Sequence, residues 1–494
     1  MSNSLLKIEN VGISFGKVQA LKNVSLEIQA GEIHCLAGEN GSGKSTLIKI
    51  ISGVYKRDKG EVFFEGEKLD HITPIDSINR GIQVIYQDFS LFPNLTVAEN
   101  LAINSEVASK KKLVNWKEIY KIAENAISRI NPNINLDQKV ENLSVAEKQM
   151  VAISRALMFN AKLIIMDEPT TALTRKEVKV LFDIILKLQK QGIAILFISH
   201  KLDEVFEISE KFSIIRNGEL VFTGETTELD DKKFTYYMTG REFDDSKFEP
   251  KNISSNPVLE VKNLFLKNSY KDIGFKVHAG EILGITGLLD SGRSELALSL
   301  FGLLPATSGD IYIHGKKQKL NNAQDAMANK IGYVPEDRLS EGLFLPRSIA
   351  DNLIISCIDE LTNVGSILDK KKRTEVINNW VKKLEIKTDN PDNAASTLSG
   401  GNQQRIVLGK WLACNPDILI LNGPTVGVDI GSKRDIHEIL QNLAEQGMTI
   451  IIISDDLPEI IQNCSRIIVI KDGKIVLEDN SAELNEQKLL DAMM

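Results

Sequence analysis

The chain repeats itself, and this internal repeat constrains the possible folds more than any other feature. Ala30–Ile33 recurs as Ala279–Ile282, 249 positions later, and the same offset relates five further glycines of the two halves. Leu143-Ser144 recurs as Leu398-Ser399 at an offset of 255. At roughly 150 residues per domain, a length of 494 residues suggests about three domains. A repeat of this period predicts two instead.

We expect a first domain over residues 5–242, a linker over 243–256 and a second domain over 257–494. The linker is polar, and Pro250 and Pro257 oppose any helix that would run through it. Each domain is long enough to bury a core of its own.

Apolar residues follow the same order in each half. Short stretches of alternating polarity come first, such as Leu6–Glu9 and Leu259–Lys262. Continuous apolar runs come later, such as Leu163–Met166 and Ile418–Leu421, and amphipathic helical stretches alternate with them. Because strands of a parallel sheet are covered on both faces, this order predicts an α/β fold with a parallel sheet in each half.

The composition argues against several classes of protein. The chain is 43% hydrophobic and 26% charged, which is typical of globular proteins. Its longest apolar run, around Ile450–Ile453, is far shorter than the ~18 residues of a membrane span, and we expect no signal peptide. A net charge of −8 disfavours general binding to nucleic-acid phosphates. Cys35, Cys357, Cys414 and Cys464 are far apart, so we expect free thiols in a reducing cytoplasm.

A phosphate-binding loop lies near the start of the first half. Residues 38–45 satisfy the P-loop pattern G-x-x-x-x-G-K-[ST], between a predicted strand, Ile33–Ala37, and a predicted helix, Thr46–Ile50. Backbone N–H groups of such a loop and the helix N-terminus bind phosphate. Lys44 would reach the β- and γ-phosphates, and Ser45 would supply a hydroxyl to Mg²⁺. The predicted nucleotide-binding residues are Gly38, Glu39, Asn40, Gly41, Ser42, Gly43, Lys44, Ser45 and Thr46.

Polar side chains follow other predicted strands, at the sheet edge where ligands bind in open α/β sheets. Asp167 would hold Mg²⁺, and Glu168 would polarise the attacking water. An acidic strand end that merely faces solvent is the alternative, which the nearby P-loop disfavours. His200 could hydrogen-bond a γ-phosphate, although a strand-end histidine taken alone is more often structural. Gln87 follows another predicted strand, but taken alone it is weak evidence for a nucleotide site.

Taken together, these motifs resemble those of the ATP-binding-cassette ATPases over nearly the whole chain. They occur in this order: the P-loop, Gln87, Leu143-Ser144, Asp167–Thr170, His200 and, in the second half, Leu398–Gln404. The tandem form and the stretch Tyr333–Arg338 resemble the fused ATPases of bacterial importers of the ribose, galactose and xylose type. The resemblance implies two fused ABC-type P-loop NTPase domains, each with a mostly parallel sheet, an antiparallel β part and a helical subdomain.

The resemblance also implies ATP and Mg²⁺ as cofactors. Two cassettes, within one chain or from two copies, would close head to tail, so that each site joins the P-loop of one to the Leu-Ser-Gly-Gly signature of the other. Nucleotide would contact Ser399, Gly400 and Gly401, and Phe15 would stack on adenine. Gln87 would join Ser45 and Asp167 at the metal. The catalytic set would be Glu168, His200 and Gln87.

Further implications concern partners. The chain would dock on membrane permease subunits at the cytoplasmic face of the cell membrane, as a peripheral subunit, and would depend indirectly on a periplasmic or lipid-anchored sugar-binding protein. No nucleic-acid partner is implied. The apolar cluster Phe89–Pro93 would contact the permease, or would simply pack locally. The lysine runs Lys110–Lys112 and Lys370–Arg373 would touch lipid head groups or be solvated helix flanks.

The second half has lost the residues that hydrolysis needs. The residues Arg293, Glu336, Asn422, Gly423 and Asp455 stand at the positions of Lys44, Gln87, Asp167, Glu168 and His200, respectively. Both carboxylates of the metal and water sites are therefore missing, and arginine does not replace lysine conservatively. We predict that the second half does not hydrolyse ATP.

The two signatures differ in the opposite sense. Ser399-Gly400-Gly401 lets a backbone approach phosphate at a helix start, whereas the first half has Ser144-Val145-Ala146. Ser144 and Glu147 also fit a capping box, and this structural role alone can explain them. We expect both signature serines to cap the helices that follow. One complete site remains, made from the first P-loop and the second signature.

We therefore predict an ATP-hydrolysing subunit of a carbohydrate importer with one complete site. The alternatives are a tandem cassette ATPase that acts on ribosomes or nucleic acid, and a regulatory scaffold without activity. The former normally has a long charged helical linker and carboxylates in both halves. The intact first site disfavours the latter. The sugar itself is not encoded here, because its selection lies in the permease and the binding protein.

Overall fold

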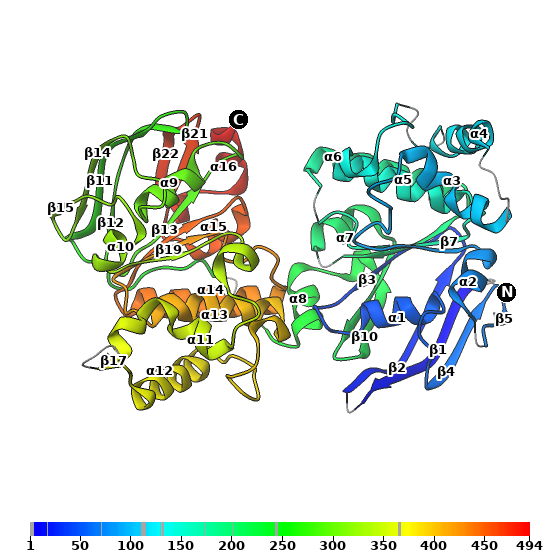
Figure 1. The fold of residues 1–494 in the computed structure, drawn as a ribbon, viewed down its shortest axis with the longest axis horizontal. Coiled ribbons are helices and arrows are strands. Elements are labelled where there is room, and N and C mark those ends of the chain that lie inside the picture. Colours follow the sequence, from blue (N-terminus) through cyan, green and yellow to red (C-terminus); the bar gives the residue numbers. More distant parts are fainter. Residues whose placement is uncertain are drawn as a thin grey trace. The chain divides into compact units, whose positions relative to one another are not determined.

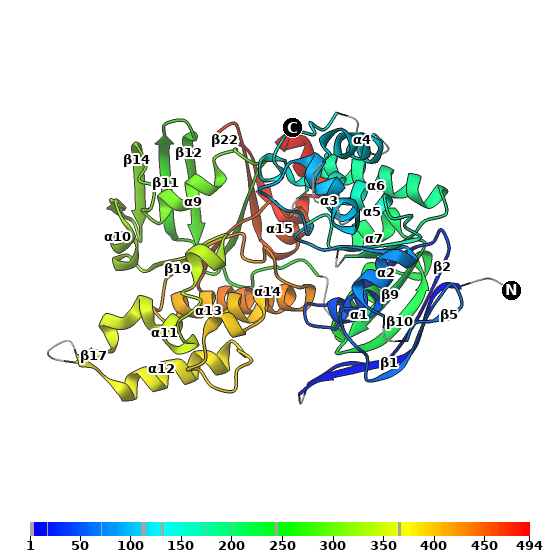
Figure 2. The ribbon, with the colours of Figure 1, turned by 45° about the vertical axis from the view of Figure 1, so that its right-hand side comes forward.

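The computed structural model describes residues 4–16, 18–70, 72–109, 115–128, 130, 133–171, 173–199, 201–242, 246–363 and 367–494. The chain divides into two compact units, unit 1 (Met1–Glu242) and unit 2 (Phe243–Met494). Within each unit, an antiparallel sheet and a group of helices lie at opposite ends of a larger sheet (Figures 1 and 2). None of the described helices combines the length and the apolar character of a membrane span.

The larger sheet of unit 1 has six strands. They are β3 (Ile33–Ala37), β6 (Ile82–Ile85), β7 (Leu163–Asp167), β8 (Ala194–Ile198), β9 (Lys211–Arg216) and β10 (Glu219–Glu225). Their order is β10-β9-β3-β8-β7-β6, and every pair is parallel except β9 with β10. Every residue of β3 and β8 is buried, which explains the continuous apolar runs of the sequence.

The smaller sheet of unit 1 is antiparallel where its long strands pair. It consists of β1 (Ser4–Phe15), β2 (Val18–Gln29), β4 (Lys59–Phe64) and β5 (Glu67–Lys68). The helices of unit 1 are α1 (Lys44–Ile51), α2 (Pro74–Arg80), α3 (Val97–Ser109), α4 (Trp116–Ile127), α5 (Val145–Leu157), α6 (Arg175–Lys190), α7 (Leu202–Ile208) and α8 (Asp231–Thr239). Helices α3, α4 and α5 share a separate apolar core at the end opposite β1, β2 and β4 (Figure 1).

Unit 2 repeats both sheets. Its larger sheet contains β13 (Ile282–Thr286), β16 (Ile331–Val334), β19 (Ile418–Asn422), β20 (Thr449–Ile453), β21 (Arg466–Lys471) and β22 (Lys474–Asn480), in the order β16-β19-β20-β13-β21-β22. Its antiparallel sheet contains β11 (Pro257–Leu266), β12 (Tyr270–His278), β14 (Ser308–Ile313) and β15 (Lys316–Gln318). A short hairpin joins β17 (Thr362–Asn363) and β18 (Ile367–Leu368).

The helices of unit 2 are α9 (Arg293–Leu300), α10 (Ala323–Ala328), α11 (Ile349–Ile354), α12 (Lys370–Lys383), α13 (Gly400–Leu412), α14 (Ile430–Glu445), α15 (Leu457–Asn463) and α16 (Glu486–Met493). Helices α11, α12 and α13 gather at the end of unit 2 opposite β11 and β14 (Figures 1 and 2). The predicted α/β fold, with a mostly parallel sheet, an antiparallel part and a helical part in each half, is confirmed.

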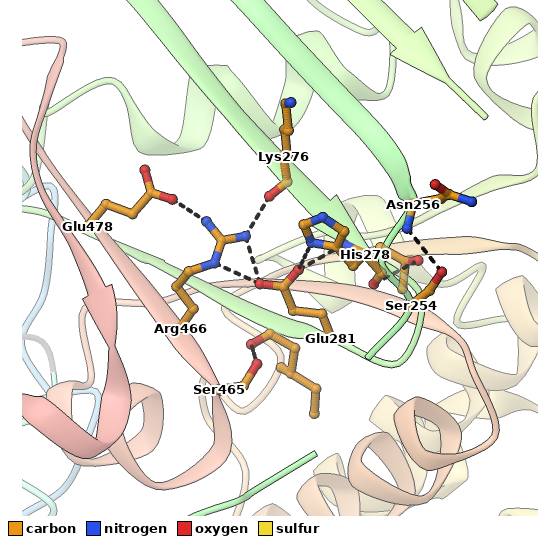
Figure 3. A network of polar contacts seen from close by, with 10 residues as sticks. Ser254, Asn256, Lys276, His278, Glu281, Ser465, Arg466 and Glu478 are labelled. Atoms are coloured by element: carbon orange, nitrogen blue, oxygen red, sulfur yellow. Dashed lines mark hydrogen bonds and ion pairs between the residues drawn. The ribbon is translucent and has the colours of Figure 1, made fainter. Parts of the chain in front are cut away.

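A network of polar contacts ties the two sheets of unit 2 together (Figure 3). The Arg466 guanidinium on β21 donates to the Glu281 carboxylate before β13, with 2.8 Å between Nε and Oε1, and to the Lys276 carbonyl on β12. Glu281 also accepts from the backbone N–H of His278 at 2.8 Å. The Glu281 side chain is only 3% exposed, so these donors compensate a charge that would otherwise be costly to bury.

The described part of the expected linker packs on unit 2. Phe248 is buried, and its N–H donates to the Gln462 carbonyl at 2.8 Å. Lys247 Nζ donates to the carbonyls of Ser481 at 2.8 Å and Leu484 at 3.1 Å. These contacts attach the segment to α15 and to the turn before α16.

Candidate nucleotide site

The P-loop of unit 1 connects β3 to α1 and is held tightly by its neighbours. Gly43 has φ 113°, and a Cβ there would lie 2.6 Å from Leu21 Cδ2 and 2.8 Å from the Ala20 carbonyl oxygen. A Cβ at Gly38 would lie 2.4 Å from the Ile215 carbonyl oxygen. Glycine is therefore required for this close approach of the loop to β2 and β9.

The loop encloses the side chain of Lys44, which is only 7% exposed. Its Nζ donates to the carbonyls of Gly38 at 2.6 Å and Glu39 at 2.9 Å. Ser45, the next residue, is exposed. Among the described residues, the buried Ser42 hydroxyl has no hydrogen-bond partner. The Lys44 ammonium, the Ser42 and Ser45 hydroxyls and the N-terminus of α1 thus lie together in one loop. This combination of donors suits a phosphate group.

The two predicted carboxylates lie beside this loop, at the end of β7. Partial burial and the Glu168 carboxylate raise the pKa of Asp167 above its ordinary value, whereas the ammonium groups of Lys44 and Lys49 act in the opposite direction. The structure therefore brings Asp167, Glu168 and Lys44 within electrostatic reach of one another. Oxygen donors of this kind, Asp167 with the exposed Ser45 hydroxyl, fit Mg²⁺.

Glu168 has an unusual backbone conformation. Its φ is 46°, in the left-handed region, and its N–H donates to the Ile198 carbonyl of β8 at 3.1 Å. Gly423 takes the same turn in unit 2, with φ 58° and a bond of 2.8 Å to the Ile453 carbonyl. Glycine adopts this conformation freely, whereas a residue with a Cβ is strained there by about 1–2 kcal/mol. Strain of this kind concentrates at functional sites, which supports a role for the Glu168 side chain.

The remaining predicted residues of unit 1 lie around this core. Phe15, at the tip of the β1–β2 hairpin, is 45% exposed. Its ring centroid lies 5.2 Å from that of Tyr55, in an edge-to-face arrangement. Tyr55 was not predicted, although an aromatic residue so soon after the P-loop helix was a usable signal. Gln87 follows β6 and is exposed. His200 lies outside the described residues.

Unit 2 builds the corresponding site differently. The Arg293 guanidinium lies 3.5 Å from the Asp455 carboxylate (Nη2 to Oδ2). Burial raises the pKa of Tyr333 to about 12. A hydrogen bond between the Tyr333 hydroxyl and the Asn422 side chain acts in the opposite direction. Arg293 and Asn422 therefore each have a polar partner within unit 2, although the buried Nη1 of Arg293 makes no hydrogen bond.

The position of the missing glutamate is also crowded. A Cβ at Gly423 would lie 3.1 Å from Glu336 Cγ. A glutamate there would also place its charge near that of Glu336.

The β1–β2 hairpin is shortened in unit 2. Ile13 pairs with Leu21 in unit 1, and the equivalent pair in unit 2 is Leu266 with Tyr270. Seven residues therefore close the hairpin in unit 1 and only three close it in unit 2. The three residues that close it in unit 2, Lys267, Asn268 and Ser269, include no aromatic residue that could correspond to Phe15. Leu304 occupies the position equivalent to Tyr55, so unit 2 lacks this aromatic pair.

The two signatures also differ in structure. Ser144 Oγ accepts from the Glu147 N–H at 3.2 Å, and the Glu147 carboxylate accepts from the Ser144 N–H at 2.8 Å. This complete capping box places a negative charge at the start of α5. A carboxylate there satisfies the helix N-terminus and repels phosphate.

The prediction that Ser399 also caps its helix is wrong. Ser399 precedes α13, but its hydroxyl accepts no backbone N–H. It accepts instead from Asn402 Nδ2 at 3.0 Å, because Asn402 Oδ1 is held by the Lys387 N–H at 2.8 Å. The start of α13 thus carries no carboxylate. A Cβ at Gly401 would lie 2.1 Å from Ser432 Oγ on α14, so only glycine fits there.

Comparison with known proteins identifies the family. The family model described as "ABC transporter" matches residues 21–171 and 270–426. The chain belongs to the ABC transporter family. The model matches once in each unit, which confirms the prediction of two fused ABC cassettes.

Relatives in the ABC transporter family match the chain over almost its full length. It is 38% identical over 487 residues to the ribose import ATP-binding protein of Bacillus subtilis (strain 168), with 98% of both chains covered. It is 41% identical over 488 residues to that of Clostridium perfringens (strain 13 / Type A), with 98% of this chain and 97% of the relative covered. A putative ribose/galactose/methyl galactoside import ATP-binding protein of Halalkalibacterium halodurans is 38% identical over 487 residues, with 98% and 93% covered.

The left-handed turn of the first ABC cassette can be tested by its stability. Glu168→Gly and Glu168→Ala both remove the carboxylate, but only alanine keeps the Cβ that opposes φ 46°. We expect the glycine variant to be more stable than the alanine variant by about 1 kcal/mol in urea unfolding. An alanine variant as stable as the glycine variant would show that position 168 is not strained.

Proposed function

We propose that this chain is the ATP-hydrolysing subunit of an importer of a monosaccharide, with ribose as the first candidate. The observation that carries the proposal is the match, over 98% of the chain, to ribose import ATP-binding proteins. The alternative of a cassette ATPase that acts on ribosomes or nucleic acid has no such support. A scaffold without activity is disfavoured by the intact set of polar groups at the first P-loop.

The first cassette binds the phosphates of ATP. Lys44 exchanges its bonds with the Gly38 and Glu39 carbonyls for bonds with β- and γ-phosphate oxygens. Ser45, Asp167 and Gln87 hold Mg²⁺, which when bound neutralises charge on the same phosphates. Phe15 and Tyr55 offer an apolar edge for the adenine ring.

Hydrolysis depends on Glu168, next to the metal ligand. Glu168 directly follows Asp167 at the end of β7 and has φ 46°, and we assign the metal to Asp167 and the attacking water to Glu168. Glu168 accepts a proton from the attacking water as general base. His200 hydrogen-bonds the γ-phosphate.

The second cassette completes this site through its signature. Ser399, Gly400 and Gly401 begin α13 with no carboxylate among them, so no charge of the signature itself repels the γ-phosphate. In the proposed pairing the first signature, whose capping box contains Glu147, would face the P-loop that carries Arg293. One complete site therefore forms between two cassettes, which pair within one chain or with a second copy.

The partners follow from this role. The chain docks on membrane permease subunits as a peripheral subunit at the cytoplasmic face, and a sugar-binding protein outside the membrane delivers the sugar to the permease. In the apolar cluster Phe89–Pro93, Phe92 is 49% exposed and is available for such a contact. Lys110–Lys112 lie outside the described residues, and Lys370–Arg373 form the first turn of α12.

Removal of the base should stop turnover without loss of binding. Glu168→Gln keeps the shape of the side chain and should lower the steady-state rate of ATP hydrolysis by roughly 10²–10⁴-fold. The Kd for ATP should stay unchanged, because Lys44 and the loop are untouched. Turnover within tenfold of wild type would contradict the assignment of Glu168 as the only base.

The two signatures offer a matched pair of variants. Ser144→Arg removes a capping hydroxyl and should lower the free energy of unfolding by ~1 kcal/mol, whereas Ser399→Arg removes no such cap. ATPase activity should change in the opposite order. We expect almost complete loss for Ser399→Arg and retention of most activity for Ser144→Arg.

Both variants are measured in the assembled transporter, with urea unfolding of the same preparations as control. Equal losses of activity would mean that closure requires both signatures. A larger loss for Ser144→Arg would show that the halves are paired wrongly.

A further inference from the structure

Arg338 lies in a rigid turn of unit 2 that no part of the proposed mechanism uses. The turn, Arg338–Gly342, is π-helical, a rare conformation that is frequent at functional sites. Asp337 fixes its start, because one carboxylate oxygen accepts from the N–H groups of Leu339 at 2.9 Å and Ser340 at 3.2 Å. The other accepts from the Ser340 hydroxyl at 2.6 Å.

The Arg338 side chain reaches two other segments of unit 2. Nη1 donates to the Val426 carbonyl at 2.7 Å, and Nη2 donates to the Gly427 carbonyl at 3.1 Å, both in the loop after β19. The same guanidinium lies against the start of α13, where a Cβ at Gly400 would lie only 2.8 Å from Nη2. Three segments far apart in the sequence therefore meet at this one side chain.

A guanidinium is suited to this position and an ammonium is not. Its planar fork presents several N–H donors in fixed directions, so it binds two successive carbonyls at once. Its flat group also fits closely against a residue without a side chain. A side chain at position 400 would therefore have to displace the guanidinium from its present place.

Unit 1 has the surrounding contacts but not the arginine. In both units a cation of the signature helix binds the loop after the edge strand of the sheet. Arg155 donates to the carbonyls of Ser90 at 2.8 Å and Phe89 at 3.1 Å, and Lys410 donates to the Gly342 carbonyl at 2.7 Å.

Unit 1 has no arginine in the corresponding stretch, where Phe89 stands two residues after Gln87 as Arg338 stands two after Glu336. Unit 2 also has three more residues before Phe344, whose N–H binds Asn352 as the Phe92 N–H binds Asn100. Unit 1 is also the unit whose signature has lost its glycines, with Val145 and Ala146 in their places. The arginine and the intact signature thus occur together in the same unit.

We propose that Arg338 is a positioning residue for ATP hydrolysis. It holds the start of α13 and the loop Val426–Gly427 in the arrangement in which Ser399, Gly400 and Gly401 meet the γ-phosphate bound by the first cassette. The proposal rests on the proposed role of the second signature. Arg338 itself contacts neither ATP nor Mg²⁺ in this account and acts through the backbone that it holds.

The test compares kcat with ATP binding in the full chain within its transporter. Arg338→Ala should lower kcat by about 10–100-fold, because small displacements of groups that meet the transition state are costly. The Kd for ATP should stay unchanged, since the P-loop lies in unit 1. Arg338→Lys, which keeps the charge but not the fork, should give an intermediate kcat.

Arg347→Ala serves as the matched control, because Arg347 is an exposed arginine close by in the chain and should leave both values unchanged. If Arg338→Ala does not fold, the comparison of Arg338→Lys with Arg347→Ala carries the same test. A kcat of the lysine variant equal to wild type would then overturn the proposal.

A double-mutant cycle distinguishes this role from a general structural one. Gly400→Ala should lower kcat in the wild-type chain, because its new methyl group displaces the guanidinium. In the Arg338→Ala background, the fold-decrease in kcat caused by Gly400→Ala should be at least tenfold smaller. Additive effects, a wild-type kcat for Arg338→Ala, or a weakened Kd for ATP would each overturn the proposal.

The outcome also separates this proposal from the proposed function. If Ser399→Arg abolishes turnover while Arg338→Ala does not, only the positioning role fails. If Ser399→Arg leaves turnover intact, the role of the second signature in the first site fails first.

Discussion

The site depends on one backbone constraint, the left-handed turn that follows strand β7 in unit 1 and strand β19 in unit 2. In both units the backbone leaves the sheet at this turn, and the N–H of the turn residue donates to a carbonyl of the neighbouring strand. In unit 1 the turn carries Glu168, which accepts the strain of a positive φ and places a carboxylate directly after Asp167. In unit 2 it carries Gly423, which forms the turn without strain and without chemistry. The turn therefore forms with either residue, so the architecture does not depend on the glutamate.

The two units have diverged in complementary directions. Unit 1 has the phosphate loop, both carboxylates and an exposed aromatic edge. Its signature, however, begins a helix whose N-terminus is capped by the Glu147 carboxylate. Unit 2 keeps an uncapped, glycine-containing signature, clamped by Arg338. At the positions of the first unit's phosphate and metal groups, Arg293 is paired with Asp455 and Asn422 with Tyr333. On the proposed assignment neither unit alone contains a complete set, so hydrolysis would require both.

Much of this was predictable from the sequence, because it depends on local pattern. The repeat offsets predicted two units, and the apolar run Ile33–Ala37 coincides with β3. Other features depend on contacts between distant segments. Asn402 fails to support a cap at Ser399 because the Lys387 N–H holds it, and Arg338 meets residues 62 to 89 positions away. The φ of Glu168 was not predictable either, since glutamate does not favour the left-handed region.

The central claim is that one chain contains a single hydrolytic site, in the P-loop of unit 1. Trapping of ADP with orthovanadate, a mimic of the γ-phosphate in the transition state, counts such sites directly. A photoreactive ADP then shows which unit holds them. The account predicts one trapped ADP per chain, with all label in peptides from unit 1. Two trapped ADP molecules per chain, or label in peptides around Arg293 in unit 2, would contradict it.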